Sequence, residues 1–298
     1  MPFPSDSYNK CMDPGLRDLR LFMALAEEGH FTRAAALEGV SQPSLTRAVA
    51  RIERSLGARL VDRTTRSVAL TTAGDRLRGE LAAVLPRLDA ALRAVKEADV
   101  LRLGFTWLLP SELARHLIDG LAAATGAQVQ LVRRDDRWGG VADGSTDAAI
   151  VYGGTGTLPS LRTVELATEA RVVAVAREHP LARRRRLRWA ELPAYPLVVN
   201  AVSGTVGPEM WPAGQRPEVA VSSRNYDEWI EMVAAGRGIG VLPATARQHP
   251  HPDVRYIAVA DSPEVSLELV LPAHGAHPLA QALERYVREA EDLGGPRG

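Results

Sequence analysis

Apolar residues recur at helical spacing along the first part of the chain, interrupted by glycines and short polar stretches. The pattern predicts one helix that ends at Gly29, a short second helix from Phe31 and a third helix capped by Ser41. Gly39 lies between the second and third helices, where a residue that adopts positive φ without penalty suits a tight turn. The run LVDRTTRSVAL at 60–70 then alternates, which predicts a hairpin. This order of helices, turn and hairpin is typical of a protein that places a helix in DNA.

The predicted third helix has an apolar stripe and a polar face. The stripe is expected to be buried and consists of Leu45, Val49, Ile52 and Leu56. The first turn and the opposite face carry Gln42, Ser44, Thr46, Arg47 and Arg51. Because Gln bonds adenine and Arg bonds guanine in the major groove, this face has the chemistry to read a base sequence. A solvated charged face is the alternative for each arginine.

Charge is distributed unevenly along the chain. The formal net charge is +0, from 36 Lys and Arg against 36 Asp and Glu, which by itself does not favour a nucleic-acid partner. Between Arg33 and Arg66, however, arginines outnumber acidic residues. A phosphate backbone responds to such a local excess, and Arg63 and Arg66 near the hairpin tip are expected to contact phosphates.

Short motifs stand at fixed spacing between residues 16 and 74, among them FTRAA at 31–35, VSQPS at 40–44 and LTTAG at 70–74. Together they resemble the winged helix-turn-helix of LysR-type transcriptional regulators. The resemblance implies that double-stranded promoter or operator DNA is a partner, contacted by Thr32, Arg33, Ser41, Gln42, Pro43, Ser44, Thr46, Arg47, Arg51, Arg63 and Arg66. One departure is Glu38, where the family usually has leucine. With Leu37 beside it, we expect the second helix to be rotated or packed slightly differently.

A long helix is predicted from Thr72 to about Ala98. Steps of four and three separate its apolar residues Leu77, Leu81, Val84, Leu88 and Leu92. Such a coiled-coil seam predicts a partner helix and hence dimerisation, with packing against its own domain as the alternative. Pro86 lies inside this pattern and is expected to kink the helix. In the family this helix pairs two subunits, which implies a homodimer, or a dimer of dimers.

Strands alternate with helices from about residue 99 onward, which predicts a parallel α/β architecture. The segments LRLGFT, DAAIV, REHPLA, LRWAELPAYPLV and AAGRGIGVLP, in that order, resemble the effector-binding domain of the same family, whose fold is similar to periplasmic solute-binding proteins. We therefore expect an α/β protein with an N-terminal winged helix-turn-helix, a long linker helix and a two-lobed C-terminal domain. The expected boundaries are a disordered tail at 1–12, the DNA-binding domain at 13–71, the linker at 72–98 and the effector domain at 99–298, with lobe I at about 99–168 and 262–298 and lobe II at about 169–261.

A small-molecule effector is expected between the two lobes, since clefts of this kind hold small ligands. Thr106 follows the first strand of the domain at the start of a helix, where backbone N–H groups favour an anion such as a carboxylate. The segment NAVSGT at 200–205 occupies the equivalent place in the second lobe. The effector-binding candidates are Thr106, Trp107, Tyr152, Asn200, Ser203, Gly204 and Thr205. Helix capping is the alternative for each hydroxyl.

Other classes of protein are disfavoured. No apolar run reaches the roughly 18–20 residues of a membrane span, and the N-terminus has no export signal, so we expect a cytoplasmic protein without a membrane partner. Cys11 is the only cysteine, which excludes an intrachain disulfide. Ser203 lacks the flanking glycines of a nucleophile elbow, and the glycine-rich run at 153–157 lacks the lysine of a phosphate loop. We expect no enzyme activity, no cofactor and no metal.

The expected function is that of a bacterial LysR-type DNA-binding transcriptional regulator that responds to a small molecule, with a carboxylate favoured. RNA polymerase is a further expected partner. The alternative is a protein that binds or senses a small ligand without acting through DNA.

Overall fold

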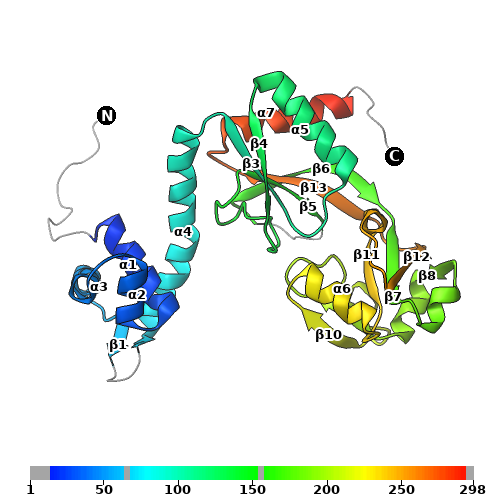
Figure 1. Ribbon diagram of the computed structural model, residues 1–298, viewed down its shortest axis with the longest axis horizontal. Helices are drawn as coiled ribbons and strands as arrows, with labels where there is room; N and C mark the ends of the chain where they lie inside the picture. Colours follow the sequence, from blue (N-terminus) through cyan, green and yellow to red (C-terminus); the bar gives the residue numbers. More distant parts are fainter. Residues whose placement is uncertain (1–13, 64–67, 154–157, 293–298) are drawn as a thin grey trace. The chain divides into compact units, whose positions relative to one another are not determined.

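The computed structural model describes residues 14–63, 68–153 and 158–292 and divides into two compact units (Figure 1). The first unit spans Met1–Asp89 and the second Ala90–Gly298. Each has its own buried core. We call them the N-terminal and C-terminal units and describe each by itself.

The N-terminal unit contains three short helices and a two-stranded hairpin, as the apolar pattern predicted. Its elements are α1 (Leu16–Glu28), α2 (Phe31–Leu37), α3 (Gln42–Leu56), β1 (Val61–Arg63), β2 (Val68–Leu70) and the first part of α4 (Thr72–Lys96). Gly29 ends α1 with φ 61°, a left-handed conformation that side chains disfavour. The predicted stripe of α3 is buried at Leu45, Val49 and Ile52. Leu56 is 52% exposed because it is the last residue of the helix.

Helix α4 runs from Thr72 to Lys96 with Pro86 inside it. Its first turns belong to the core of the N-terminal unit, where Leu81 and Leu85 are buried and Leu77 packs against them. Thr71 precedes the helix, and its hydroxyl accepts the N–H of Gly74 at 3.1 Å. The start of α4 is therefore fixed to the hairpin that precedes it.

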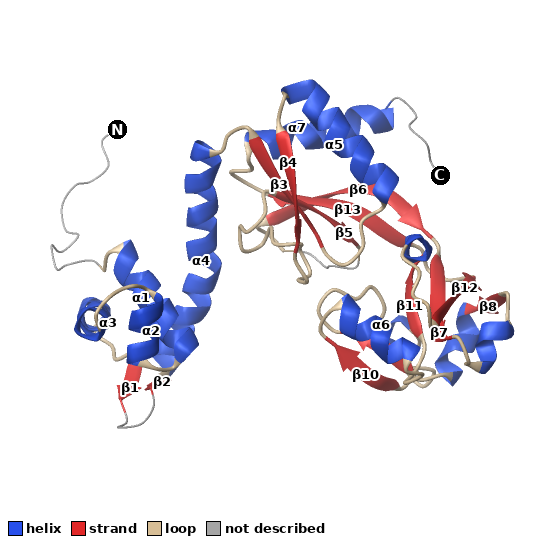
Figure 2. Cartoon of the chain, viewed as in Figure 1, coloured by secondary structure: helices blue, strands red, loops and turns tan. Residues whose placement is uncertain are grey.

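The C-terminal unit contains two lobes, each built on its own sheet (Figure 2). Lobe I has the sheet order β4-β3-β5-β13-β6 and two helices. Its elements are β3 (Val100–Phe105), α5 (Ser111–Thr125), β4 (Gln128–Arg133), β5 (Ala148–Tyr152), β6 (Leu161–Glu169), β13 (Val265–Pro272) and α7 (Pro278–Asp292). Figure 1 shows α5 and α7 packed side by side against this sheet.

Lobe II has a four-stranded sheet of order β11-β7-β12-β8 and the separate pair β10-β9. Its strands are β7 (Arg171–Ala176), β8 (Arg186–Arg188), β9 (Leu197–Asn200), β10 (Val219–Ser223), β11 (Gly240–Pro243) and β12 (Val254–Ala260). The helix α6 (Tyr226–Ala234) is joined by the short 3-10 helices η1 (Pro180–Arg183), η2 (Trp189–Ala194), η3 (Pro208–Met210) and η4 (Ala244–Gln248).

The chain passes between the lobes twice. It leaves lobe I where β6 ends at Glu169 and β7 begins at Arg171, and it returns between the end of β12 at Ala260 and the start of β13 at Val265. The expectation of a parallel sheet was only partly right. Strand β3 is parallel to β4 and β5, but β13 is antiparallel to β5 and β6. The crossing strands run in opposite directions, so a purely parallel sheet is not possible.

Within the described residues no helix is long and apolar enough to cross a membrane. In the same part of the chain, no three His, Cys, Asp or Glu side chains are grouped so that they would hold a metal ion.

Candidate functional site

The exposed face of α3 begins with a chain of hydrogen bonds. The hydroxyl oxygens of Ser41 and Ser44 lie 2.9 Å apart, and Arg47 Nη2 donates to Ser44 Oγ at 3.3 Å. Gln42 and Pro43 are exposed beside them. These bonds orient Arg47 toward the N-terminal turn of the helix before any partner binds.

Arg51, predicted to contact DNA, is held from within the protein. Its guanidinium forms a fork-like pair with the carboxylate of Asp18 on α1, with Nε to Oδ2 at 2.9 Å and Nη2 to Oδ1 at 2.5 Å. Asp18 is 8% exposed, and the hydrogen bond from Arg51 lowers the pKa of this carboxyl. Thr46 is only partly exposed on the same helix. Arg51 therefore joins α3 to α1.

The two predicted contacts in α2 differ in their surroundings. Thr32 is exposed, and its backbone N–H donates to His30 Nδ1 at 3.2 Å. Arg33 Nη2 donates to the backbone oxygen of Glu28 at 2.6 Å, and its Nε lies 3.4 Å from the same residue's carboxylate. Arg33 is therefore exposed but tied to the C-terminal end of α1.

Glu38 lies just past the end of α2, as its C-cap residue. Both Glu38 and Leu37 are exposed, whereas Ala34 and Ala35 face the core of the unit. The carboxylate of Glu38, which replaces the leucine usual in the family, is therefore in solvent and does not enter the core.

The hairpin is anchored to α3 through Glu53. One oxygen of this carboxylate accepts the backbone N–H groups of Leu60 at 2.8 Å and Val61 at 3.3 Å. Arg63 is the last residue of β1. Arg66 lies outside the described residues.

The seam predicted along α4 divides into two parts. Leu77 and Leu81 pack into the core of their own unit, which is the alternative that the spacing left open. Val84, Leu88 and Leu92 are 53%, 37% and 51% exposed. These three apolar side chains are therefore not covered by the core of the N-terminal unit, and their role in dimerisation stays a prediction.

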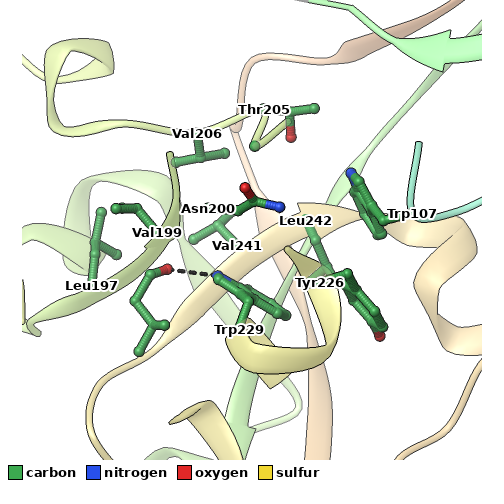
Figure 3. Close-up of a pocket in the computed structure, with 12 residues that line it drawn as sticks. Trp107, Leu197, Val199, Asn200, Thr205, Val206, Tyr226, Trp229, Val241 and Leu242 are labelled. Atoms are coloured by element: carbon green, nitrogen blue, oxygen red, sulfur yellow. Dashed lines mark hydrogen bonds between the residues drawn. The ribbon is translucent and has the colours of Figure 1, made fainter. Parts of the chain in front are cut away.

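Four aromatic rings form a continuous stack in the C-terminal unit. The ring centre of Trp107 lies 5.9 Å from that of Tyr152 and 5.1 Å from that of Tyr226, and Tyr226 lies 5.8 Å from Trp229. Tyr152 and Trp107 belong to lobe I, while Tyr226 and Trp229 belong to α6 in lobe II. Figure 3 shows Trp107, Tyr226 and Trp229 along one wall of a pocket. The stack therefore crosses from one lobe to the other.

Polar contacts also join the lobes near this stack, among them Thr245 on η4, which donates from its hydroxyl to Glu169 Oε1 at the end of β6. The indole Nε1 of Trp107 donates to the backbone oxygen of Ser203 at 3.3 Å. Arg133, at the end of β4, donates from Nη2 to Asp227 Oδ2 on α6 at 3.0 Å. Since Arg133 and Asp227 are exposed, the ion pair is a weak link between the lobes.

The loop after β9 is folded by its own side chains. Asn200 Oδ1 accepts the N–H groups of Val202 and Ser203, at 3.0 and 3.1 Å, and Asn200 Nδ2 donates to Ser203 Oγ at 3.0 Å. A side chain at Gly204 would place its Cβ 2.3 Å from the backbone oxygen of Asn200, so only glycine fits there. The polar groups of Asn200 and Ser203 hold the loop in shape.

Thr106 and Tyr152 are buried, at 2% and 3% exposure. The hydroxyl of Thr106 has no hydrogen-bond partner in the described part of the chain. Tyr152 donates from its hydroxyl to Glu169 Oε1 at 2.8 Å, and burial raises the pKa of this phenol. Neither residue lines the cavities described next, whereas Trp107 lines the smaller one.

Two cavities adjoin the loop after β9. The smaller one, about 20 Å³, lies against the aromatic stack, and the larger one, about 510 Å³, opens between the loop and the crossing strands. The residues that line both are Val199, Asn200, Gly204, Thr205 and Val206. Asn200, Gly204 and Thr205, three of the predicted effector-binding residues, therefore line both cavities.

Three residues of this region were not predicted from the sequence. Tyr226 and Trp229 line the smaller cavity, and Arg171 lines the larger one. The i, i+3 spacing of Tyr226 and Trp229 on a helix was an available signal. For Arg171 the signal was a charge directly before the apolar run VVAVA.

A helix-turn-helix unit followed by a two-lobed α/β unit with a cavity between its lobes defines a DNA-binding protein with a ligand-binding domain. Residues 16–75 match the family model of the bacterial regulatory helix-turn-helix protein, lysR family, and residues 94–292 match that of the LysR substrate binding domain. The chain belongs to the LysR family of transcriptional regulators.

Individual relatives agree with this assignment. The chain is 31% identical to the uncharacterized HTH-type transcriptional regulator YnfL of Escherichia coli (strain K12), over 88% of this chain and 94% of that protein. It is also 31% identical to the HTH-type transcriptional regulator TtuA of Agrobacterium vitis, over 92% of each. The crystal structure of CbnR, a LysR family transcriptional regulator, has the same fold, with a TM-score of 0.69 and 21% identity over 93% of this chain and 99% of CbnR.

Family membership confirms the predicted fold class and the prediction of a DNA-binding transcriptional regulator with an effector-binding domain. The members of this family act as regulators rather than as enzymes, as expected from the sequence.

Proposed function

We propose that this protein regulates transcription as a homodimer, or a dimer of dimers, that reads promoter DNA through α3 and binds a small-molecule effector between the lobes of its C-terminal unit. RNA polymerase is the further partner through which a bound regulator would act. The observation that carries the proposal is the presence of an exposed, preordered polar face on α3 and a lined inter-lobe cavity on one chain.

The DNA-reading part rests on Gln42, Ser44 and Arg47. Their side chains occupy the N-terminal turn and exposed face of α3, the part of a recognition helix that enters the major groove. The bond between Ser41 and Ser44 and the bond from Arg47 to Ser44 reduce the conformational entropy lost on binding. Arg51 supports this face indirectly, because its pair with Asp18 fixes the orientation of α3.

The dimer rests on the exposed part of the α4 seam. Val84, Leu88 and Leu92 form an apolar stripe that the N-terminal core does not cover. Pairing two such stripes would remove them from water and would place two recognition helices on one DNA duplex. Each copy contributes its own phosphate contacts, so pairing compensates for a chain without net charge.

The response to an effector rests on the contacts that close the cleft. The stack of Trp107 on Tyr226 and the bond from Trp107 to Ser203 hold the lobes together without a ligand. A ligand that enters between the lobes gains affinity only for the arrangement that admits it, and this differential affinity shifts the equilibrium between arrangements. The lobe arrangement is the element that would carry the signal to the DNA-binding units.

Footprinting of the full-length protein on genomic fragments tests this function. The expected result is protection of two segments separated by one helical turn or a multiple of it, and a change in that pattern when a cognate metabolite is added. Protection of a single segment would contradict the dimeric arrangement. A footprint that no member of a broad metabolite panel changes would contradict the effector response.

A further inference from the structure

A buried arginine lies where the two chain crossings between the lobes meet. Arg171 is the first residue of β7 and is 4% exposed. Its Nε donates to the backbone oxygen of Pro263, on the return crossing, at 2.9 Å. Its Nη1 donates to Thr205 Oγ1, on the loop after β9, at 3.0 Å. Arg171, at the start of the outgoing strand, is therefore bonded to the returning segment and to the loop that lines the cavities.

The charge of Arg171 has no counter-ion in the part of the chain that the structure describes. Both of its hydrogen-bond acceptors are neutral. Glu169, the carboxylate nearest to Arg171 along the chain, ends the preceding strand β6 and is already engaged with Tyr152 and Thr245. Burial lowers the pKa of Arg171 to about 10, and no neighbouring carboxylate opposes this effect. An unpaired buried charge is costly for the fold, so its retention calls for a partner.

The cavity of about 510 Å³ provides room for such a partner. Arg171 and Thr205 line it, together with Arg137 on the lobe I side. Glu209 and Glu264 also line the cavity, but neither forms an ion pair with Arg171. The two Nη2–H groups of Arg171 donate to no acceptor among the described residues. The cavity thus combines space, a cation and unused donors.

We propose that Arg171 is the anion-binding residue of the effector site and that the effector is a small carboxylate whose acid group pairs with its guanidinium. A planar carboxylate matches the fork of donors that a guanidinium presents. This inference rests on the proposed function, because it names the chemical class of the effector. It also moves the anion site from Thr106 to the crossing strands, since α5 begins only at Ser111 and Thr106 does not lie at a helix N-terminus as predicted.

The position of Arg171 links binding to lobe movement. A carboxylate paired with Arg171 lies against the loop of Thr205 and against the segment of Pro263 at the same time. Neutralising the buried charge stabilises the arrangement in which these three segments stay together. An uncharged ligand in the same cavity would not neutralise Arg171. The site should therefore favour a negatively charged ligand over a neutral one of the same shape.

Thermal unfolding of the full-length protein in defined salts tests the proposal. Sodium acetate, succinate and benzoate are compared with sodium chloride at matched ionic strength, and succinamide and benzamide serve as neutral analogues. At least one carboxylate is expected to raise the Tm by several degrees above chloride, with no rise from its amide. A Tm that no carboxylate raises above chloride would overturn the proposal. An equal or larger rise with sodium sulfate would assign the site to inorganic oxyanions and overturn it as well.

Variants locate the effect. Arg171→Met is expected to abolish the carboxylate-dependent rise, and Arg171→Lys, which keeps the charge without the fork, to retain part of it. Arg177→Met is the matched control, because Arg177 follows the same strand, is exposed and also donates from Nε to a backbone oxygen, that of Pro252 at 2.9 Å. This control should keep the full rise. An unchanged rise in Arg171→Met, or its loss in Arg177→Met, would contradict the assignment.

The outcome separates this inference from the proposed function. If a neutral metabolite changes the footprint while carboxylates neither change it nor raise the Tm, the effector response stands and the role of Arg171 fails. If the protein protects no DNA segment, the proposed function fails whatever the salts do. Circular dichroism of Arg171→Lys and Arg171→Met without added carboxylate establishes that a lost rise reflects lost binding and not a lost fold.

Discussion

Arg51 of α3 donates hydrogen bonds to both carboxylate oxygens of Asp18 on α1, at 2.9 Å from Nε and 2.5 Å from Nη2. The pair joins the recognition helix to the first helix of the same unit. An arginine held in this way has two of its donor groups occupied, whereas Arg47 on the exposed face bonds a serine hydroxyl. Two arginines with similar positions in the sequence pattern therefore have different partners in the structure.

Arg51→Met should destabilise the N-terminal unit by about 1–2 kcal/mol, because it leaves the buried carboxylate of Asp18 without its partner. The loss stays small because Arg51 is partly exposed and solvent weakens the pair. Hydrogen exchange of the α1 and α3 amides in full-length protein measures this local free energy of unfolding. Arg54→Met is the control, since Arg54 is exposed on the same helix and bonds only the backbone oxygen of Ala50. Equal effects of the two substitutions would argue against a structural role for the pair.

The same pair predicts how stability depends on pH. The hydrogen bond from Arg51 lowers the pKa of Asp18 in the folded unit below the value of about 3.9 of an unfolded aspartate. The stabilisation is therefore complete above that unfolded value and is lost as the pH falls through the lower folded value. Unfolding of wild type and of Arg51→Met, followed between pH 2 and pH 6, should differ most at the upper end of this range. Parallel curves would show that the carboxylate contributes nothing.

Gln42→Ala and Arg47→Ala should reduce discrimination between operator and random DNA, each base contact being worth about 1–3 kcal/mol. Competition binding with the two DNAs separates this effect from a general loss of affinity. A uniform loss on all sequences would place these side chains on phosphates.

Leu88→Asp should break the dimer while leaving each unit folded, since Leu88 is part of the exposed stripe of α4. Leu81→Asp should instead unfold the N-terminal unit, because Leu81 is 7% exposed within its core. Light scattering and circular dichroism distinguish the two results. A Leu88→Asp protein that keeps the mass of two chains would rule out this stripe as the dimer contact.

Trp107→Ala should loosen the two lobes, because it removes the ring between Tyr152 and Tyr226 together with the bond to Ser203. Hydrogen exchange of α6 and of the loop after β9 is expected to become several-fold faster. Trp107→Phe keeps a ring and loses only the hydrogen bond, so its effect should be smaller. Unchanged exchange in Trp107→Ala would mean that the stack does not hold the lobes.

Local periodicity was enough to predict the helices, the hairpin and the buried stripe of Leu45, Val49 and Ile52, because these depend on residues close in sequence. The partner of Arg51 lies 33 residues away, and the acceptors of Arg171 lie 34 and 92 residues away. Contacts over such distances depend on the tertiary fold, which spacing alone does not specify.

The apolar seam of α4 also depends on the tertiary fold. The spacing by three and four predicted that Leu81 and Leu88 lie on one face of one helix. It does not specify which of the two packs against the helix's own domain. The packing of α4 against its own core decides that Leu81 is buried and Leu88 is exposed. Asn200 is a similar case, because its place beside the cavity was predicted and its role in folding the loop was not.

The salt dependence of binding to a selected operator, compared with random DNA, tests whether paired α3 helices read the DNA. The logarithm of the binding constant should fall steeply and linearly with the logarithm of the salt concentration, and the operator should be preferred by about 10³-fold or more. Leu88→Asp should have roughly half of the wild-type slope, because each copy supplies its own phosphate contacts. A flat salt dependence, or equal affinity for operator and random DNA, would contradict a protein that reads DNA through paired α3 helices.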